Sequence, residues 1–155
     1  MKIVTVVKDA AYRENLEKLL RKLGQEYKSA ETVCGGQEGY NLIKEEVPDL
    51  IIADISLSRM GGLVMLKKLR REKIHSRVIL LAEKEDLRQI RQALELGVEG
   101  YFIKPVQMAQ LEKRILQIEQ QVDREYVTEV VFTAENILMG LSLIHISEPT
   151  RLDVI

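Results

Sequence analysis

The sequence has little net charge, a single cysteine and no long apolar stretch, and each shortage excludes a class of protein. Its 23 Lys and Arg residues against 24 Asp and Glu residues give a net charge of −1, which creates no overall field toward nucleic acid or an anionic membrane. Cys34 excludes a disulfide within the chain, and its apolar neighbours favour a buried, reduced thiol. No signal peptide follows Met1 and no apolar run could span a bilayer, so we expect a cytoplasmic protein without a membrane segment.

The 155 residues are enough for one globular domain with a hydrophobic core, and its segments alternate in character. Short apolar or β-branched runs alternate with longer stretches that carry apolar residues at helical spacing. We expect strands at residues 3–7, 31–34, 50–54, 77–81 and 100–103, and helices at residues 10–23, 37–46, 63–69, 85–96 and from 107 onward. Five such units predict an α/β fold of the flavodoxin-like (βα)5 type, a doubly wound parallel sheet with the strand order 2-1-3-4-5.

The most informative stretch is the unbroken apolar run 50–53, which ends in Asp54. Such a run predicts a strand buried on both faces, with Asp54 at its C-terminal end. Ligands bind at that edge of open α/β sheets, so Asp54 is a candidate for chemistry, although a helix cap or a turn explains an aspartate there equally well. In the order 2-1-3-4-5, the ends of strands one, three and five converge and bring Lys8, Asp9 and Lys104 to the same crevice.

An acid after strand one, an aspartate after strand three and a Lys-Pro pair after strand five resemble the receiver domain of two-component response regulators. Residues 60–63 (Met-Gly-Gly-Leu) and 97–105 match the same family locally. The resemblance covers almost all of residues 1–121, which we take as the receiver domain. It implies a phosphoprotein that is not an enzyme and that accepts a phosphoryl group on Asp54 from a sensor histidine kinase.

The resemblance also implies roles for the neighbours of the phosphoacceptor. Because an anionic donor meets an anionic acceptor, Mg²⁺ is expected, held by the carboxylates of Asp9 and Asp54 and the backbone carbonyl of Ser56. Lys104 would place its ammonium on the phosphoryl oxygens, and the peptide before Pro105 is expected to be cis, as in the family.

Lys8 departs from the family, because receivers usually carry a second acid at this position. The charges of Asp9, Asp54, Lys8 and Lys104 add up to zero, where a second acid would give −2. We therefore expect weaker Mg²⁺ binding if the Lys8 ammonium points inward, and little change if it extends into solvent.

Ala82, at the end of strand four, is a second departure from the family, which usually has Thr or Ser at this position. The missing hydroxyl removes a hydrogen bond to the phosphoryl group worth about 1.5 to 3 kcal/mol. The resemblance then implies weaker coupling between phosphorylation and the switch aromatic, Tyr101. Because Ala82 is small, Tyr101 is expected to occupy its inward rotamer without phosphate.

Three functions are compatible with these residues. The leading hypothesis is a receiver that controls transcription through a DNA-binding domain missing from this chain, and the residue patterns 63–70 and 92–97 are similar to regulators with an AraC-type helix-turn-helix domain. Lys8 and Ala82 also motivate a pseudo-receiver, a phosphorylation-independent interaction or dimerisation module. A flavodoxin-like binder of a phosphorylated ligand has less support, because residues 8–11 form no Gly-rich phosphate loop.

A homodimer would form through the fourth helix, the fifth strand and the fifth helix. The fifth helix carries apolar residues at 4-3-4 spacing, which fits either a dimerising seam or the core-facing stripe of a last helix: Leu111, Ile115, Ile118 and Val122.

The end of the chain departs from the receiver pattern. Residues 122–140 predict a linker and the start of a truncated downstream domain, since residues 126–132 are mostly β-branched or aromatic and Thr133 could cap a new helix. Residues 141–155 are predicted to be an artefact, because residues 141–151 match one reading frame of a transposon-based sequencing adapter.

Overall fold

The computed structural model describes residues 1–30 and 36–138, the last three by their backbone alone. The chain forms two compact units, of which the first is Met1–Arg114 and the second begins at Ile115. Among the described helices, none is both long and apolar enough to cross a membrane.

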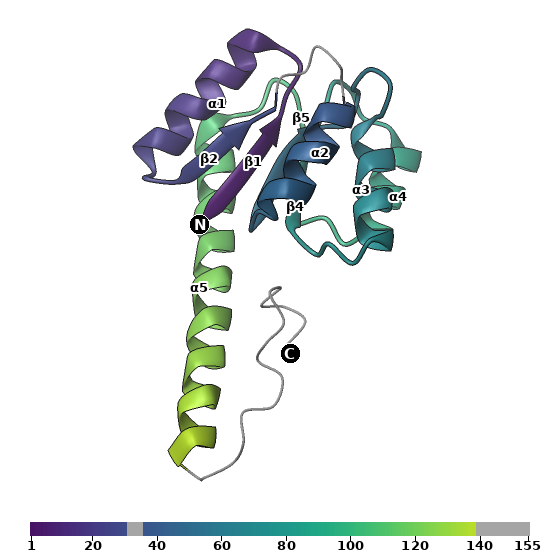
Figure 1. The fold of residues 1–155 in the computed structure, drawn as a ribbon. Helices are drawn as coiled ribbons and strands as arrows, with labels where there is room; N and C mark the ends of the chain where they lie inside the picture. Colours follow the sequence, from purple (N-terminus) through teal and green to yellow (C-terminus); the bar gives the residue numbers. More distant parts are fainter. Residues whose placement is uncertain (31–35, 139–155) are drawn as a thin grey trace. The chain divides into compact units, whose positions relative to one another are not determined.

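A parallel sheet of five strands in the order β2-β1-β3-β4-β5 forms the centre of the first unit (Figure 1). The strands are β1 (Lys2–Val6), β2 (Glu26–Ser29), β3 (Leu50–Asp54), β4 (Arg77–Ala82) and β5 (Gly100–Ile103). This architecture confirms the predicted fold class and strand order. In the parallel register Asp54 lies beside Leu81, and Ala82 lies beside Ile103.

Helices cover both faces of the sheet (Figure 1). One face carries α1 (Ala10–Lys22) and the first turns of α5 (Met108–Leu138), and the Lys22 ammonium lies 3.6 Å from the Glu112 carboxylate. The other face carries α2 (Gly36–Glu46), α3 (Gly62–Arg71) and α4 (Leu87–Glu95). The leucines that predicted these helices face the core, and they include Leu16, Leu20, Leu66 and Leu69.

The central strand β3 is buried along its whole length, as its unbroken apolar composition predicts. The fully buried side chains Leu50, Ile51, Ile52 and Ala53 precede Asp54, which is 2% exposed. Residues on both sides of the sheet therefore pack against this strand, and its last carboxylate, that of Asp54, is buried with it.

The second strand lies earlier in the chain than expected. Residues 31–34, where it was predicted, lie outside the described residues, as does Cys34, whereas Glu26–Ser29 pairs with β1. The Thr5 hydroxyl donates a hydrogen bond to the Ser29 hydroxyl (2.7 Å). β2 is an edge strand whose side chains alternate between exposed and half-buried, so it lacks the apolar run on which the prediction depended.

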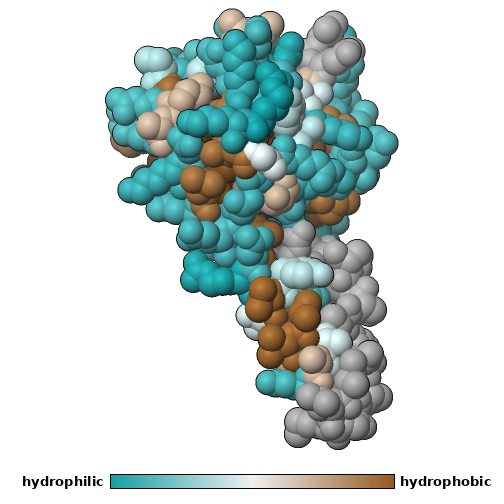
Figure 2. Space-filling view, turned by 90° about the vertical axis from the view of Figure 1, so that its left-hand side faces the viewer, coloured by the Kyte–Doolittle hydropathy of each residue, from teal (hydrophilic) through white to brown (hydrophobic). Residues whose placement is uncertain are grey.

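The last helix is longer than expected. The helix predicted to begin at Thr133 is a continuation of α5, in which the Thr133 hydroxyl donates to the Glu129 carbonyl (3.0 Å). The predicted stripe of Leu111, Ile115, Ile118 and Val122 is buried within the single chain and so is not an exposed seam. A second apolar set on α5 is exposed instead: Tyr126, Val127, Val130, Val131 and Phe132. Figure 2 shows apolar surface on the C-terminal half of this helix.

Candidate functional site

Strands β1, β3 and β5 end close together and place Asp54 between two lysines. Asp54 Oδ2 accepts a hydrogen bond from the backbone N–H of Lys8 (2.8 Å). Asp54 Oδ1 lies 2.8 Å from Nζ of Lys104, which follows β5. Both oxygens of the buried carboxylate are thus held by positively polarised groups, which fixes its direction.

Lys104 is the most enclosed cation of the site, with a side chain that is 11% exposed. Burial by itself lowers the pKa of Lys104, but the attraction of the Asp54 and Glu83 carboxylates outweighs burial, so the pKa is raised above 10.5. The ammonium also lies over the ring of Tyr12, 4.9 Å from its centroid. The Lys104–Pro105 peptide is cis, as the resemblance implies.

Glu83 belongs to this cluster, although the sequence analysis did not include it. Its Oε1 lies 3.2 Å from Lys104 Nζ and 3.9 Å from Lys8 Nζ. The pairing register of β4 with β5 indicates its position. Ala82 pairs with Ile103, so Glu83 and Lys104, which follow them, are neighbours. The Lys104 N–H donates to the Ala82 carbonyl (2.7 Å), which holds the two strand ends together.

Glu83 also changes the electrostatics expected of the site. With three carboxylates and two ammonium groups the formal charge is −1, where the sequence analysis gave zero. The Lys8 ammonium pairs with Glu83 and its side chain is 44% exposed, so it lies at the rim of the site. Its charge therefore opposes a bound cation less than an inward-pointing ammonium would.

Asp9, at the edge of the site, caps the N-terminus of α1. Its Oδ1 accepts a hydrogen bond from the N–H of Tyr12 (2.9 Å) and caps α1. The cap uses Oδ1, and because a carboxylate has two oxygens, the same residue can also contribute a ligand to a cation.

The donor set suits a weakly held Mg²⁺. This ion takes oxygen ligands and is usually held by one or two carboxylates with several waters, which Asp9 and Asp54 can supply. Asp54 Oδ1 is buried and its contact with Lys104 lacks hydrogen-bond geometry, so it retains lone pairs for a cation. No three His, Cys, Asp or Glu side chains of the described residues are grouped to hold a metal, so the remaining ligands would be the Ser56 carbonyl and water.

The predicted switch residues Ala82 and Tyr101 belong to the same part of the core. Ala82 is buried in the cluster on the α2–α4 side of the sheet, and Tyr101 packs against that cluster. The Tyr101 hydroxyl is buried and has no hydrogen-bond partner among the described residues. Burial raises the pKa of Tyr101, and the negative charge of Asp86 raises it further. The hydroxyl is therefore enclosed on the side of the sheet whose core includes Ala82.

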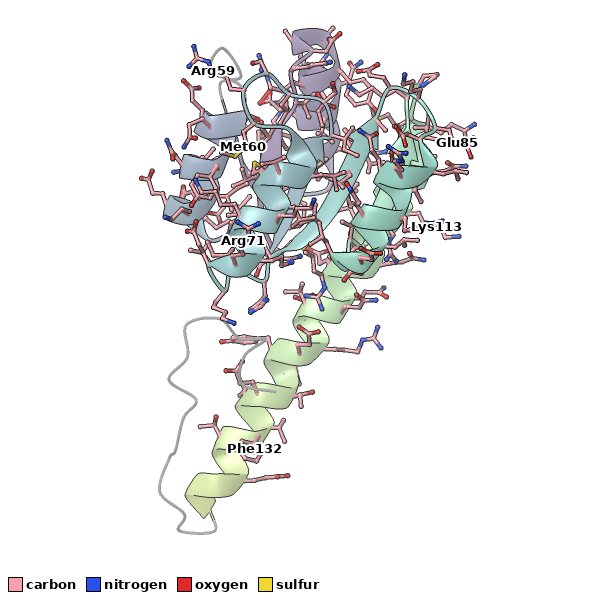
Figure 3. All side chains as sticks on the ribbon, turned by 90° about the vertical axis from the view of Figure 1, so that its right-hand side faces the viewer. Arg59, Met60, Arg71, Glu85, Lys113 and Phe132 are labelled. Atoms are coloured by element: carbon pink, nitrogen blue, oxygen red, sulfur yellow. The ribbon has the colours of Figure 1, made fainter. Side chains whose placement is uncertain are left out.

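The loop after Asp54 folds back onto the end of β3. Figure 3 shows Arg59 and Met60 in this loop and Glu85 after β4, all at the end of the sheet opposite to Arg71. The Gly62 N–H donates to the Ile55 carbonyl (2.9 Å), and a Cβ at Gly62 would lie 2.4 Å from the Asp54 carbonyl oxygen. Only glycine permits this approach, so the loop geometry is tied to the backbone of the candidate phosphoacceptor.

Gly62→Ala is expected to destabilise the domain by about 1 to 3 kcal/mol, because the added methyl group overlaps a backbone oxygen that cannot move freely. The midpoint of urea unfolding measures the change. Gly61→Ala is the matched control, since its Cβ would lie 3.1 Å from the nearest atom and should cost less. Equal midpoints for the two variants would show that the loop shifts without resistance.

A family model for the response regulator receiver domain matches residues 3–116, so the chain belongs to this family. It is 29% identical over 130 residues to the transcriptional regulatory protein AfsQ1 of Streptomyces coelicolor, across 84% of this chain and 56% of that protein. The probable C4-dicarboxylate response regulator DctR of Bacillus subtilis is 32% identical over 93 residues, across 57% of this chain and 41% of that protein. The chain spans about half the length of these curated relatives.

A solved structure shows the same fold. The N-terminal domain of an uncharacterized protein from Wolinella succinogenes superposes with a TM-score of 0.72 at 28% identity, across 81% of this chain and 98% of that one. The similarity therefore extends over a whole solved domain and not over one motif.

Proposed function

We propose that this chain is the phosphoacceptor receiver of a response regulator, phosphorylated on Asp54 by a histidine kinase. Receiver domains are generally signalling modules and not enzymes, and they interact with histidine kinases. The observation that carries the proposal is the buried Asp54 carboxylate, held at the strand end by the Lys8 N–H and the Lys104 ammonium at 2.8 Å each.

The residues of the site have distinct tasks in the transfer. An Asp54 oxygen attacks the phosphorus of a phosphohistidine, the P–N bond breaks, and the histidine nitrogen leaves with the electron pair. Mg²⁺, when bound by Asp9, Asp54 and Ser56, neutralises negative charge on the reacting oxygens. The Lys104 ammonium, already directed at Asp54, donates to a phosphoryl oxygen once the acyl phosphate has formed.

Control of transcription is the proposed output. The relatives named above are a transcriptional regulatory protein and a response regulator, and this chain covers only about half of each. DNA binding would come from a further domain, and its AraC type is a prediction that depends on the patterns of residues 63–70 and 92–97 alone.

A homodimer through α4, β5 and α5 is part of the same proposal. Three apolar side chains support it because they are exposed on α4 and β5: Leu87, Leu94 and Ile103. Burial of these side chains against a second copy would remove apolar surface from water.

The proposal is tested by incubating the chain with Mg²⁺ and acetyl phosphate and measuring its intact mass over a quenched time course. The wild type is expected to gain the mass of one phosphoryl group, and Asp54→Asn is expected to gain none. Sedimentation of the same samples tests whether the modified chain dimerises. A wild type that gains no mass at any time point would contradict the proposal and favour the pseudo-receiver.

A further inference from the structure

Glu83 and Asp54 are bound to the same ammonium group. Lys104 Nζ lies 2.8 Å from Asp54 Oδ1 and 3.2 Å from Glu83 Oε1, and the same ammonium faces the ring of Tyr12. The Glu83 contact has hydrogen-bond geometry, whereas Asp54 Oδ1 lies at ion-pair distance without it. A phosphoryl oxygen that arrives at Asp54 therefore competes with Glu83 for the N–H groups of this ammonium.

Glu83 is the neighbour most easily displaced. Its contact with Lys104 is longer than that of Asp54, and its side chain is 54% exposed, against 2% for Asp54. Exposed ion pairs are weak because water and salt compete with them. Displacing Glu83 leaves its carboxylate hydrated, whereas displacing Asp54 would leave a buried charge without its partner.

The Glu83 carboxylate also opposes the approach of an anion. It pairs with Lys8 as well as with Lys104, so it offsets the two positive charges that would otherwise attract a phosphodonor. With Glu83 in place, the five charged groups Asp9, Asp54, Glu83, Lys8 and Lys104 have a formal charge of −1. Without Glu83 their charge would be 0, which opposes the approach of an anionic donor less.

We propose that Glu83 is a specificity-determining residue that occupies the phosphoryl position on Lys104 and disfavours small anionic phosphodonors. The inference rests on the proposed function, because it concerns donors that react at Asp54. In the reaction with acetyl phosphate, an Asp54 oxygen attacks the phosphorus, the P–O bond to the acetyl group breaks, and acetate leaves with the electron pair. One Lys104 N–H passes from Glu83 to a phosphoryl oxygen, and Glu83 itself forms no covalent bond.

The first arm of the test compares initial rates of phosphorylation by acetyl phosphate in Mg²⁺ for the wild type, Glu83→Gln and Glu85→Gln. Glu85 is a matched control: it is an exposed acid two residues away, labelled in Figure 3, and within the described part of the chain it forms no ion pair with Lys8 or Lys104. Glu83→Gln should lower the half-saturating acetyl phosphate concentration roughly three- to tenfold, and Glu85→Gln less than twofold. The difference should shrink as KCl is added.

The second arm needs no covalent transfer and separates the two proposals. Orthophosphate is titrated into the same three proteins while the Cε–Hε signals of Lys104, assigned with Lys104→Met, are followed by NMR. Glu83→Gln should reach half saturation at a lower phosphate concentration than Glu85→Gln. If no protein gains phosphoryl mass, the proposed function has failed, and this titration still decides the role of Glu83.

Two results would overturn the inference. One is equal half-saturating acetyl phosphate concentrations for Glu83→Gln and Glu85→Gln while both are phosphorylated. The other is an orthophosphate response of Lys104 that is the same in both variants, which would show that the Glu83 carboxylate does not compete with an anion for this ammonium.

Discussion

Lys104→Met is expected to destabilise the domain by about 3 kcal/mol at neutral pH, because it leaves the Asp54 carboxylate buried without its ion-pair partner. The value lies at the lower end of the range for a broken buried pair, since the Lys8 N–H still donates to Asp54 Oδ2. Urea unfolding of the purified domain measures the loss. Adding Asp54→Asn to Lys104→Met should restore most of the stability, because the uncompensated charge is then absent.

The pH dependence of this loss follows from Lys104. Its pKa is raised in the folded protein, so the stabilising charge is fully present below 10.5 and is lost as the pH rises through the folded-state pKa. The difference between the wild type and Lys104→Met should therefore be constant from neutral pH to about pH 9.5 and narrow above about pH 10.5. An equal loss in the single and double variants would show that Lys104 acts through packing and not through the charge of Asp54.

Ala82→Thr is expected to move the Tyr101 ring outward and to make its position depend on phosphorylation. Ala82 is fully buried, so two added heavy atoms must either overpack the core, at about 1 to 3 kcal/mol, or displace a neighbour. Tyr101 is the neighbour that can leave, since it is only partly buried and its hydroxyl has no hydrogen bond to lose within the described residues. The pKa of Tyr101 should then fall toward 10.0, which tyrosine ring NMR in a pH titration measures.

Ala82→Val is the matched control, because valine has the shape of threonine without the hydroxyl. Both variants should move the ring, but only Ala82→Thr should draw it back inward when beryllofluoride occupies the site, since only threonine can bind the phosphoryl mimic. The wild-type ring should respond little to the mimic, because no hydroxyl at position 82 links the ring to the phosphoryl site. An outward ring in the unmodified wild type would contradict the proposal that Ala82 pre-sets the switch.

The sequence predicted the parts of the fold in which buried positions require apolar residues. Residues 50–53 of β3 are all apolar because helices cover this strand on both sides, and β5 has its predicted bounds, Gly100–Ile103. β2 was misplaced because an edge strand needs no apolar run, and Glu26–Ser29 reads as a polar segment. The length of α5 was missed because β-branched residues at 126–132 favour strands, whereas the structure continues the helix through them.

The sequence predicted the site residues that lie at the ends of strands. It did not predict the direction in which their side chains point. Asp54 and Lys104 meet because β3 and β5 are parallel strands of one sheet, so their C-terminal ends lie at the same edge. The strand order that places them there is that of the flavodoxin-like fold, which the alternating strands and helices predict. Glu83 was not predicted because its place beside Lys104 follows from the register of β4 with β5, which the sequence does not show directly. The Lys8 ammonium pairs with Glu83, so whether it points inward or into solvent could not be predicted without the position of Glu83.

The two apolar stripes of α5 are out of phase around the helix axis. Each residue turns an α-helix by about 100°, so the set Tyr126, Val127, Val130 and Val131 points about a third of a turn away from the buried stripe that ends at Val122. Three charged residues, 123–125, separate the two stripes and set this angle. Deleting one of them would rotate the exposed stripe by about 100° and align it with the buried one, whereas deleting seven residues would change its direction by only about 20°. The direction in which this apolar surface faces is therefore set by the number of residues between the two stripes. Adding or removing one residue would redirect the exposed stripe without changing any of its side chains.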